Sequence, residues 1–252
     1  MKRISVQLYS LRQRCAENFV QVLQDVAAMG YAGVETAGLQ GRSPAEIRRI
    51  CDDLGLVVSS AHVGMPTAEN LNETVETAKA LGYEYVISGY GPDQFRTLNA
   101  IKAAAEDAAA AAELLKPHGL KLGCHNHYWE FDLVEGRYGY SWFFEMAPNV
   151  FSELDTYWAC NFGVVDVPLV VAMHKKNLPL LHIKDGPLVK GQPHTAVGAG
   201  KMNFKAVIKA AGPTTQWLVV ELDECATDMT EAVRQSCRYL AKNRFGKGRK
   251  RA

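Results

Sequence analysis

The chain alternates between short β-type runs and longer helix-type runs along its whole length, and this alternation limits the folds open to it. Eight apolar runs are each followed by a helix-type pattern, with a repeat of roughly 30 residues. Glycines mark the ends of several helix patterns, as at Gly30, Gly55 and Gly82. The expected strands are residues 4–9, 32–36, 56–62, 85–89, 120–125, 150–155, 180–185 and 217–222. The expected helices are residues 17–29, 43–54, 67–81, 95–117, 141–147, 168–176, 204–211 and 228–243.

Eight such units in 252 residues, with no linker between them, predict a single (β/α)8 barrel, the TIM barrel fold. We place the barrel in residues 1–245 and expect residues 246–252 to be a basic disordered tail. A doubly wound sheet is the main alternative. It is disfavoured because no GxGxxG motif follows the first strand and no P-loop is present.

The charge balance excludes several classes of partner. Lys and Arg total 28 against 27 Asp and Glu, so we expect no binding to nucleic acid or to anionic membranes. No apolar run is long enough to span a bilayer, and the N-terminus lacks the apolar core of a signal peptide. The six cysteines form no CxxC pair, which favours reduced thiols and a cytoplasmic protein.

Polar residues gather where the expected strands end, and function in a barrel of this kind lies at that end. Three pairs spaced two apart share a direction on their strands: His125 with His127, His182 with Lys184, and Glu221 with Asp223. Asp155, His182 and Glu221 come from three successive strands. Because buried charges must be paired or bound to a metal, this convergence predicts a divalent cation such as Mn²⁺, Fe²⁺, Co²⁺ or Zn²⁺. A lone His62 is more often a loop-support residue than a ligand, whereas Glu35 could equally pair with a neighbouring Arg or Lys or belong to the site. Asp185 is expected to cap the loop after its strand.

Six stretches carry a family resemblance, in the expected order along the chain. The chain resembles the xylose isomerase-like TIM barrels, and within them the sugar phosphate isomerase/epimerase group whose fifth strand has an HNH signature. The stretches are residues 5–12, 125–131, 154–159, 181–185, 198–200 and 220–223.

The resemblance implies a catalytic divalent metal, Mn²⁺ first, with Mg²⁺, Co²⁺, Fe²⁺ or Zn²⁺ as alternatives. Asp155, His182 and Glu221 match three of four ligand positions. At the fourth, many relatives have a glutamate where this chain has His125. Either His125 or Glu130 is then the fourth ligand; we favour Glu130, which keeps two glutamates in the site.

The function expected from this set is isomerisation or epimerisation of a keto-sugar or sugar derivative. A metal-bound carbonyl would acidify the neighbouring carbon, and a base would take its proton to form an enediolate. His127 is the first candidate for the base, followed by His125 and Glu221. Substrate contacts are expected from Tyr9, Glu35, His62, Trp129, Trp158 and Lys184. A phosphate subsite has little support unless Gly198-Ala199-Gly200 forms an anion nest.

Three other functions remain open from the sequence. The same enediolate would support a lyase or dehydratase, for example one acting on a 3-keto glycoside or an inosose. A non-catalytic sugar-binding or partner subunit is suggested by the missing strand-five glutamate. An abasic-site endonuclease is disfavoured by the neutral charge balance and the small number of histidines. The short chain leaves little sequence for a lid, so we expect a neighbouring protomer to help close the barrel mouth, in a homo-oligomer or a hetero-complex.

Overall fold

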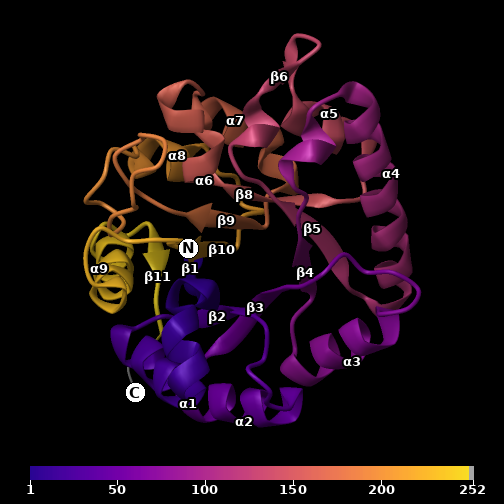
Figure 1. The fold of residues 1–252 in the computed structure, drawn as a ribbon. Coiled ribbons are helices and arrows are strands. Elements are labelled where there is room, and N and C mark those ends of the chain that lie inside the picture. Colours follow the sequence, from indigo (N-terminus) through magenta and orange to yellow (C-terminus); the bar gives the residue numbers. More distant parts are fainter. Residues whose placement is uncertain (250–252) are drawn as a thin grey trace.

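Eight parallel strands pair around a closed ring in the computed structural model, which describes residues 1–249 (Figure 1). The ring closes because β10 pairs with β1. The strands are β1 (Lys2–Gln7), β2 (Gly33–Ala37), β3 (Val57–His62), β4 (Tyr85–Ser88), β5 (Lys121–His125), β8 (Phe151–Asp155), β9 (Leu180–Ile183) and β10 (Trp217–Val220). The expected (β/α)8 barrel is confirmed, and no end of an expected strand is displaced by more than two residues.

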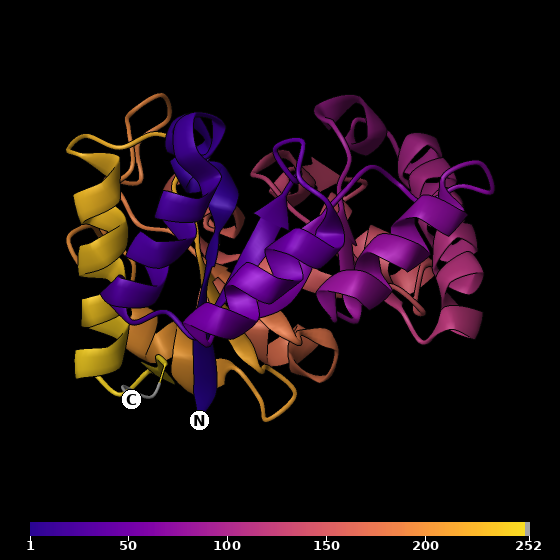
Figure 2. The ribbon, with the colours of Figure 1, turned by 90° about the horizontal axis from the view of Figure 1, so that it is seen from below.

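Helices surround the strands and follow one another around the ring in chain order (Figure 1). They are α1 (Arg12–Met29), α2 (Pro44–Leu54), α3 (Leu71–Leu81), α4 (Leu98–Leu115), α5 (Gly139–Met146), α6 (Thr156–Ala159), α7 (Val167–His174), α8 (Phe204–Ala210) and α9 (Met229–Lys242). Figure 2 shows α9 packed beside α1, so the last helix meets the first. Within residues 1–249, no helix is both long and apolar enough to cross a lipid bilayer.

Local sequence signals set several of the helix ends. Ser43 caps α2 by accepting the backbone N–H of Glu46, and Pro44 is the first helical residue. Gly30 ends α1 in a left-handed conformation, with a φ of 100°. These signals explain why the expected end of α1 and both expected ends of α2 are close to those of the structure. The starts of two helices differ more: α1 begins five residues before the expected residue 17, and α3 begins four residues after the expected residue 67.

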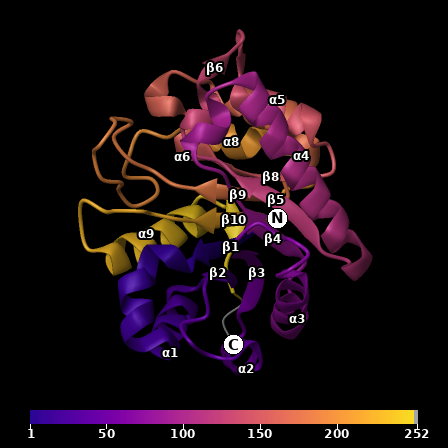
Figure 3. The same ribbon diagram turned by 45° about the vertical axis from the view of Figure 1, so that its right-hand side comes forward.

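Two short strand pairs lie outside the main alternation. β6 (Leu133–Val134) and β7 (Arg137–Tyr138) form an antiparallel hairpin that projects beyond the helices (Figure 3). β11 (Gly246–Lys247) pairs with Lys2 and Arg3 of β1. Residues 246 and 247, the first two of the expected disordered tail, are therefore ordered as a strand. They can pair there because β2 pairs with Ser5–Gln7 of β1, which leaves the backbone of Lys2 and Arg3 available on the same edge. Residues 250–252 of the expected tail lie outside the described residues.

The barrel interior changes from apolar to polar toward the carboxyl ends of the strands. Its apolar floor is one buried cluster, formed by Ala32, Tyr85, Ile87, Phe151, Leu180, Trp217 and Val219. The Phe151 ring fits against β5 because residue 123 is glycine; an added Cβ there would lie 2.2 Å from the ring. Along β8, Phe151 is followed on the same face by Glu153 and then Asp155. The apolar layer fills the interior of the barrel below, so the polar inward side chains near the carboxyl ends of the strands lie above it, at the barrel mouth.

Candidate active site

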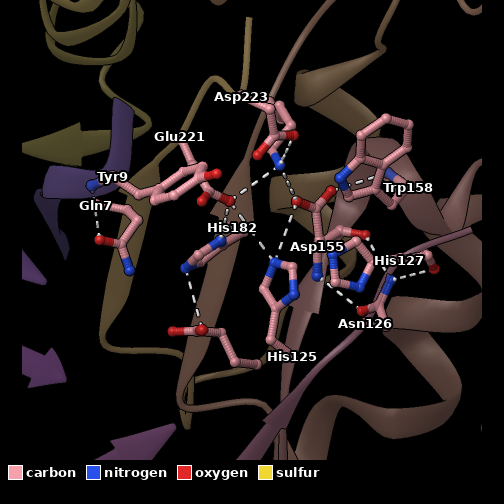
Figure 4. Close-up of polar contacts among 12 residues, drawn as sticks. Gln7, Tyr9, His125, Asn126, His127, Asp155, Trp158, His182, Glu221 and Asp223 are labelled. Atoms are coloured by element: carbon pink, nitrogen blue, oxygen red, sulfur yellow. Dashed lines mark hydrogen bonds and ion pairs between the residues drawn. The ribbon is translucent and has the colours of Figure 1, made fainter. Parts of the chain in front are cut away.

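Four side chains from four neighbouring strand ends converge at the barrel mouth (Figure 4). His125 ends β5, Asp155 ends β8, His182 lies in β9, and Glu221 follows β10. All four are buried, and one ligand-type atom from each lies within 4.8 Å of the others. We call His125, Asp155, His182 and Glu221 the four-residue cluster. The structure thus brings together the three residues singled out by the strand-end pattern and adds His125.

Glu130 is not a member of this cluster, contrary to the fourth-ligand assignment favoured above. A short 3-10 turn, Trp129–Phe131, directs its carboxylate back to the chain, where Oε2 accepts the backbone N–H of His127 at 2.9 Å. Burial raises the pKa of Glu130 to about 8, although backbone hydrogen bonds oppose this shift. His125 Nε2 instead lies 3.4 Å from Asp155 Oδ2 and 3.7 Å from Glu221 Oε2. Of the two alternatives, the geometry favours His125.

His182 is held from both sides by carboxyl groups. Its Nδ1 lies 2.9 Å from Glu221 Oε2, and its Nε2 lies 3.1 Å from both Glu35 Oε1 and Glu153 Oε2. Burial alone would lower the pKa of His182, but its contacts with the carboxyl groups of Glu153, Glu35 and Glu221 raise it well above its ordinary value. The imidazole orientation is therefore fixed from below, with Nδ1 directed at the cluster.

Glu35 and Glu153 form a buried layer beneath the cluster rather than part of the mouth. Glu35 is fully buried, and its carboxylate accepts hydrogen bonds from Gln7 Nε2 and Ser60 Oγ. It therefore does not reach the mouth to contact a sugar, which corrects the expectation from sequence. Burial alone would raise the pKa of Glu35, but His182 lowers it to about 2. Burial and the adjacent Glu35 charge raise the pKa of Glu153 well above its ordinary value, so the proton of this acid pair resides on Glu153.

Glu153 was missed in the sequence, although a signal was present. It lies two residues before Asp155 and therefore shares its inward direction. Asn126 was also not assigned a role. Its amide joins β5 to β8: Oδ1 accepts the backbone N–H of Asp155 at 2.9 Å, and Nδ2 donates to the Asp155 carbonyl at 3.3 Å. The middle residue of the HNH signature thus positions a member of the cluster.

Lys184 is fully buried beside the cluster and is not exposed to substrate as the sequence reading expected. Its Nζ lies 2.7 Å from Asp223 Oδ2, 2.9 Å from Glu221 Oε2 and 3.1 Å from Asp155 Oδ2. Burial alone would raise the pKa of Asp155 and of Glu221. The Lys184 ammonium is the main cause that instead lowers the pKa of both carboxylates.

A cavity of about 460 Å³ opens onto the cluster. His125 and Glu221 form part of its wall, together with Tyr9, His62 and His127. The ring centroid of His125 lies 5.5 Å from that of His62 and 5.1 Å from that of His127. Burial and the charge of His125 lower the pKa of His62 to about 4 and that of His127 to about 3. Both imidazoles are therefore unprotonated at neutral pH, as a proton acceptor must be.

The two tryptophans expected to contact substrate pack around the cavity instead of lining it. Trp129 stacks on His127, with ring centroids 4.1 Å apart and planes inclined by 12°. Trp158 lies over Lys184 Nζ, 5.2 Å from the ring centroid, and its backbone N–H is capped by Asp155 Oδ1. Tyr9, by contrast, lines the cavity with 44% of its surface exposed. The tryptophans hold the imidazole and the ammonium in place, and Tyr9 is the aromatic residue available to a ligand.

Asp185 fastens the long loop between β9 and α8, as its expected capping role required. Its buried carboxylate accepts four backbone N–H groups, from Gly186, Gly198, Gly200 and Met202, at 2.8–3.1 Å. The Gly198–Gly200 stretch is therefore an anion nest, but the anion it holds is a side chain of the same chain. An external phosphate would have to displace Asp185, so this stretch provides no phosphate subsite.

The same loop places His194, which sequence reasoning missed, against the mouth. His194 is buried, and its Nδ1 accepts the backbone N–H of Asp223 at 3.3 Å. Its ring packs against Tyr157 and Trp158, with centroids 4.9 and 5.2 Å away. No strand-end pattern marks His194, because its position depends on the path of a loop.

The donor groups of the four-residue cluster fit a divalent cation. Among residues 1–249, Asp155 Oδ2 is paired with the Lys184 ammonium, but neither ring nitrogen of His125 has a hydrogen-bond partner, although both nitrogens are buried. Such atoms are costly to bury unless something else binds them. Two ligands at about 2.1 Å from one tetrahedral ion lie about 3.4 Å apart, close to the distance between His125 Nε2 and Asp155 Oδ2. Two imidazoles and two carboxylates suit Zn²⁺, Fe²⁺, Co²⁺ or Mn²⁺.

Comparison with known proteins agrees with this architecture. The model of the xylose isomerase-like TIM barrel family matches residues 23–243. A sugar phosphate isomerase/epimerase from Parabacteroides distasonis has a TM-score of 0.77 and 25% identity, covering 98% of this chain and 96% of that one. No curated protein sequence matches the chain significantly.

Two further solved structures are similar in fold alone. A probable 3-DHS dehydratase involved in petrobactin synthesis, from Bacillus anthracis, has a TM-score of 0.73 at 11% identity and covers 96% of this chain and 99% of that one. The IOLI protein with a binding zinc atom has a TM-score of 0.73 at 12% identity and covers 95% of this chain and 97% of that one.

Proposed function

The chain belongs to the xylose isomerase-like TIM barrel family, and we propose that it is a metal-dependent isomerase or epimerase of a keto-sugar or a related sugar derivative. One observation carries the proposal: His125 and Glu221 of the four-residue cluster line a cavity of about 460 Å³, which two unprotonated imidazoles, His62 and His127, also line. The similarity to a solved sugar phosphate isomerase/epimerase supports the same class of reaction.

In this proposal His125, Asp155, His182 and Glu221 hold one divalent cation, with Mn²⁺ as the first candidate and Zn²⁺, Fe²⁺, Co²⁺ or Mg²⁺ as alternatives. When bound, the cation would polarise a substrate carbonyl and acidify the neighbouring C–H bond. The protein contributes fixed ligand directions. Glu35 and Glu153 orient His182, and the Asn126 amide orients the backbone of Asp155.

His127 is the residue we propose as the proton acceptor. It lines the cavity beside His125, and its Nδ1 is buried without a hydrogen-bond partner among residues 1–249. Stacking on Trp129 fixes its ring plane. His62 also lies close to His125 and lines the cavity, where it is suited to bind a hydroxyl group or, after taking up a proton, to return it to the substrate. Glu221 is the second candidate for the base, although its ion pairs with Lys184 and His182 weaken it in that role.

The substrate is proposed to lack a phosphate group. The Gly198–Gly200 nest is filled by Asp185, and the Lys184 ammonium is committed to three carboxylates. A neutral polyhydroxy compound matches a cavity lined by imidazoles, the Gln7 amide and the Tyr9 ring.

A lyase or dehydratase is the second candidate function. His62 and His127 both lie close to His125, and the imidazole that removes the proton would, once protonated, donate that proton to the leaving group. The first chemical step is then the same, and only the product differs.

Solvent exchange tests the proposal directly. The Mn²⁺-loaded protein is incubated in D₂O with a panel of ketoses and keto-glycosides, and NMR follows deuterium incorporation next to the carbonyl. We expect exchange with at least one substrate and its loss in His127→Asn, with exposed His118→Asn as the matched control. In a parallel reaction in H₂O, a product of unchanged mass identifies an isomerase or epimerase, and a product lacking the leaving group identifies a lyase. Undiminished exchange in His127→Asn would contradict the role given to His127.

A further inference from the structure

Lys184 shares its partners with the candidate metal centre. Its Nζ contacts Asp155 Oδ2 at 3.1 Å and Glu221 Oε2 at 2.9 Å. The same two oxygen atoms face the unpartnered Nε2 of His125. Figure 4 shows Asp155 and Glu221 directed toward one another across the mouth, with Asp223 above them. An ammonium group and a divalent cation would therefore use the same two oxygens.

Among residues 1–249, one ion-pair partner of Lys184 lies outside the four-residue cluster. This is Asp223, whose Oδ2 lies 2.7 Å from Nζ and whose side chain is 34% exposed. Asp223 lies two residues after Glu221, so the two side chains point in the same direction, and Asp223 lines the cavity at the barrel mouth. The ammonium can therefore give up Asp155 and Glu221 while remaining paired with Asp223.

From this arrangement we propose that Lys184 is a built-in competitor for the divalent cation. In the metal-free protein its ammonium neutralises the two carboxylates of the cluster, and the fully buried side chain keeps that charge in place. A bound cation displaces the ammonium toward Asp223, because two positive charges on the same oxygens repel each other in a buried site. Lys184 thus weakens metal binding and makes the centre less dependent on metal for its stability. This inference rests on the metal centre proposed above.

Metal affinity tests the inference. Chelator-stripped wild type, Lys184→Met and the charge-conserving Lys184→Arg are titrated with Mn²⁺ and Zn²⁺ in a calorimeter. We expect Lys184→Met to bind at least about tenfold more tightly than wild type, and Lys184→Arg to bind within about threefold of it. Saturating metal should also raise the melting temperature of Lys184→Met more than that of wild type.

Two negative results have different meanings. If wild type binds metal and Lys184→Met binds no more tightly, the competitor role is wrong and the metal centre stands. If neither protein binds metal, the centre itself is overturned, and the competitor role with it.

A second measurement needs no variant and therefore does not depend on the folding of Lys184→Met. In a crystal structure of Mn²⁺-soaked wild type, we expect Lys184 Nζ to contact Asp223 and to have left Asp155 Oδ2. An ammonium that still contacts both Asp155 and Glu221 beside a bound ion would overturn the proposal.

Discussion

Replacing Gly200 by alanine should destabilise the protein through a single steric conflict. An added Cβ would lie 2.2 Å from Asp185 Oδ1 and 2.5 Å from the backbone nitrogen of Gly186. The Asp185 carboxylate would have to move away from the N–H groups of Gly198, Gly200 and Met202, which it now binds at 2.8–3.1 Å. Three such bonds at about 1 kcal/mol each give a loss of about 3 kcal/mol.

For a chain of this length, that loss lowers the melting temperature by about 6–12 °C. Thermal denaturation followed by circular dichroism measures the effect. Gly64→Ala is the matched control, because an added Cβ at Gly64 meets no atom within 4 Å. A Gly200→Ala melting temperature within about 2 °C of wild type would show that Asp185 does not fasten the loop as described.

Two further predictions concern buried titratable groups. Burial, with the Lys184 charge as the second cause, lowers the pKa of His194 to about 4. In the unfolded chain the pKa of a histidine is about 6.5, so between these two pH values the unfolded state binds a proton that the native state does not. The free energy of unfolding should therefore fall as the pH drops from about 6.5 to about 4. Urea titrations across this range should show a smaller fall for His194→Asn than for wild type, with exposed His118→Gln as the control, and an unchanged pH dependence would refute the assignment. The second prediction compares Glu35 with Glu153. Glu153→Gln should lower the free energy of unfolding by less than about 1 kcal/mol, because Glu153 already carries a proton. Glu35→Gln should lower it by about 3 kcal/mol, because this change removes a negative charge that pairs with His182. Equal unfolding free energies for the two variants would refute this placement of the proton.

The strand positions and their inward residues could be predicted because they depend on local periodicity. Asp155, His182 and Glu221 are separated widely in sequence, yet each lies within one residue of the end of a strand, and parallel strands in a barrel end at one face. The alternation of inward and outward side chains also predicted the direction of His125. These inferences needed only the strand pattern and the closure of the barrel.

The placements that differ from expectation depend on how deep a side chain lies in the barrel and on the paths of loops. Glu35 ends an expected strand, but its pairing with Gln7 of β1 and Ser60 of β3 places it one layer below the mouth. Glu130 is turned away by a 3-10 segment that no periodicity in the sequence marks. His194 reaches the mouth through a loop held by Asp185, so its position follows from four backbone contacts within tertiary structure.

The metal content of the purified protein shows whether the four-residue cluster binds a divalent cation. Wild type, His125→Ala and Glu130→Gln are expressed with Mn²⁺ supplementation, and bound metal is measured by elemental mass spectrometry. We expect about one ion per chain in wild type and in Glu130→Gln, and loss of the ion in His125→Ala, because His125 belongs to the four-residue cluster and Glu130 does not. Loss of the ion in Glu130→Gln with retention in His125→Ala, or no metal in wild type, would contradict this expectation.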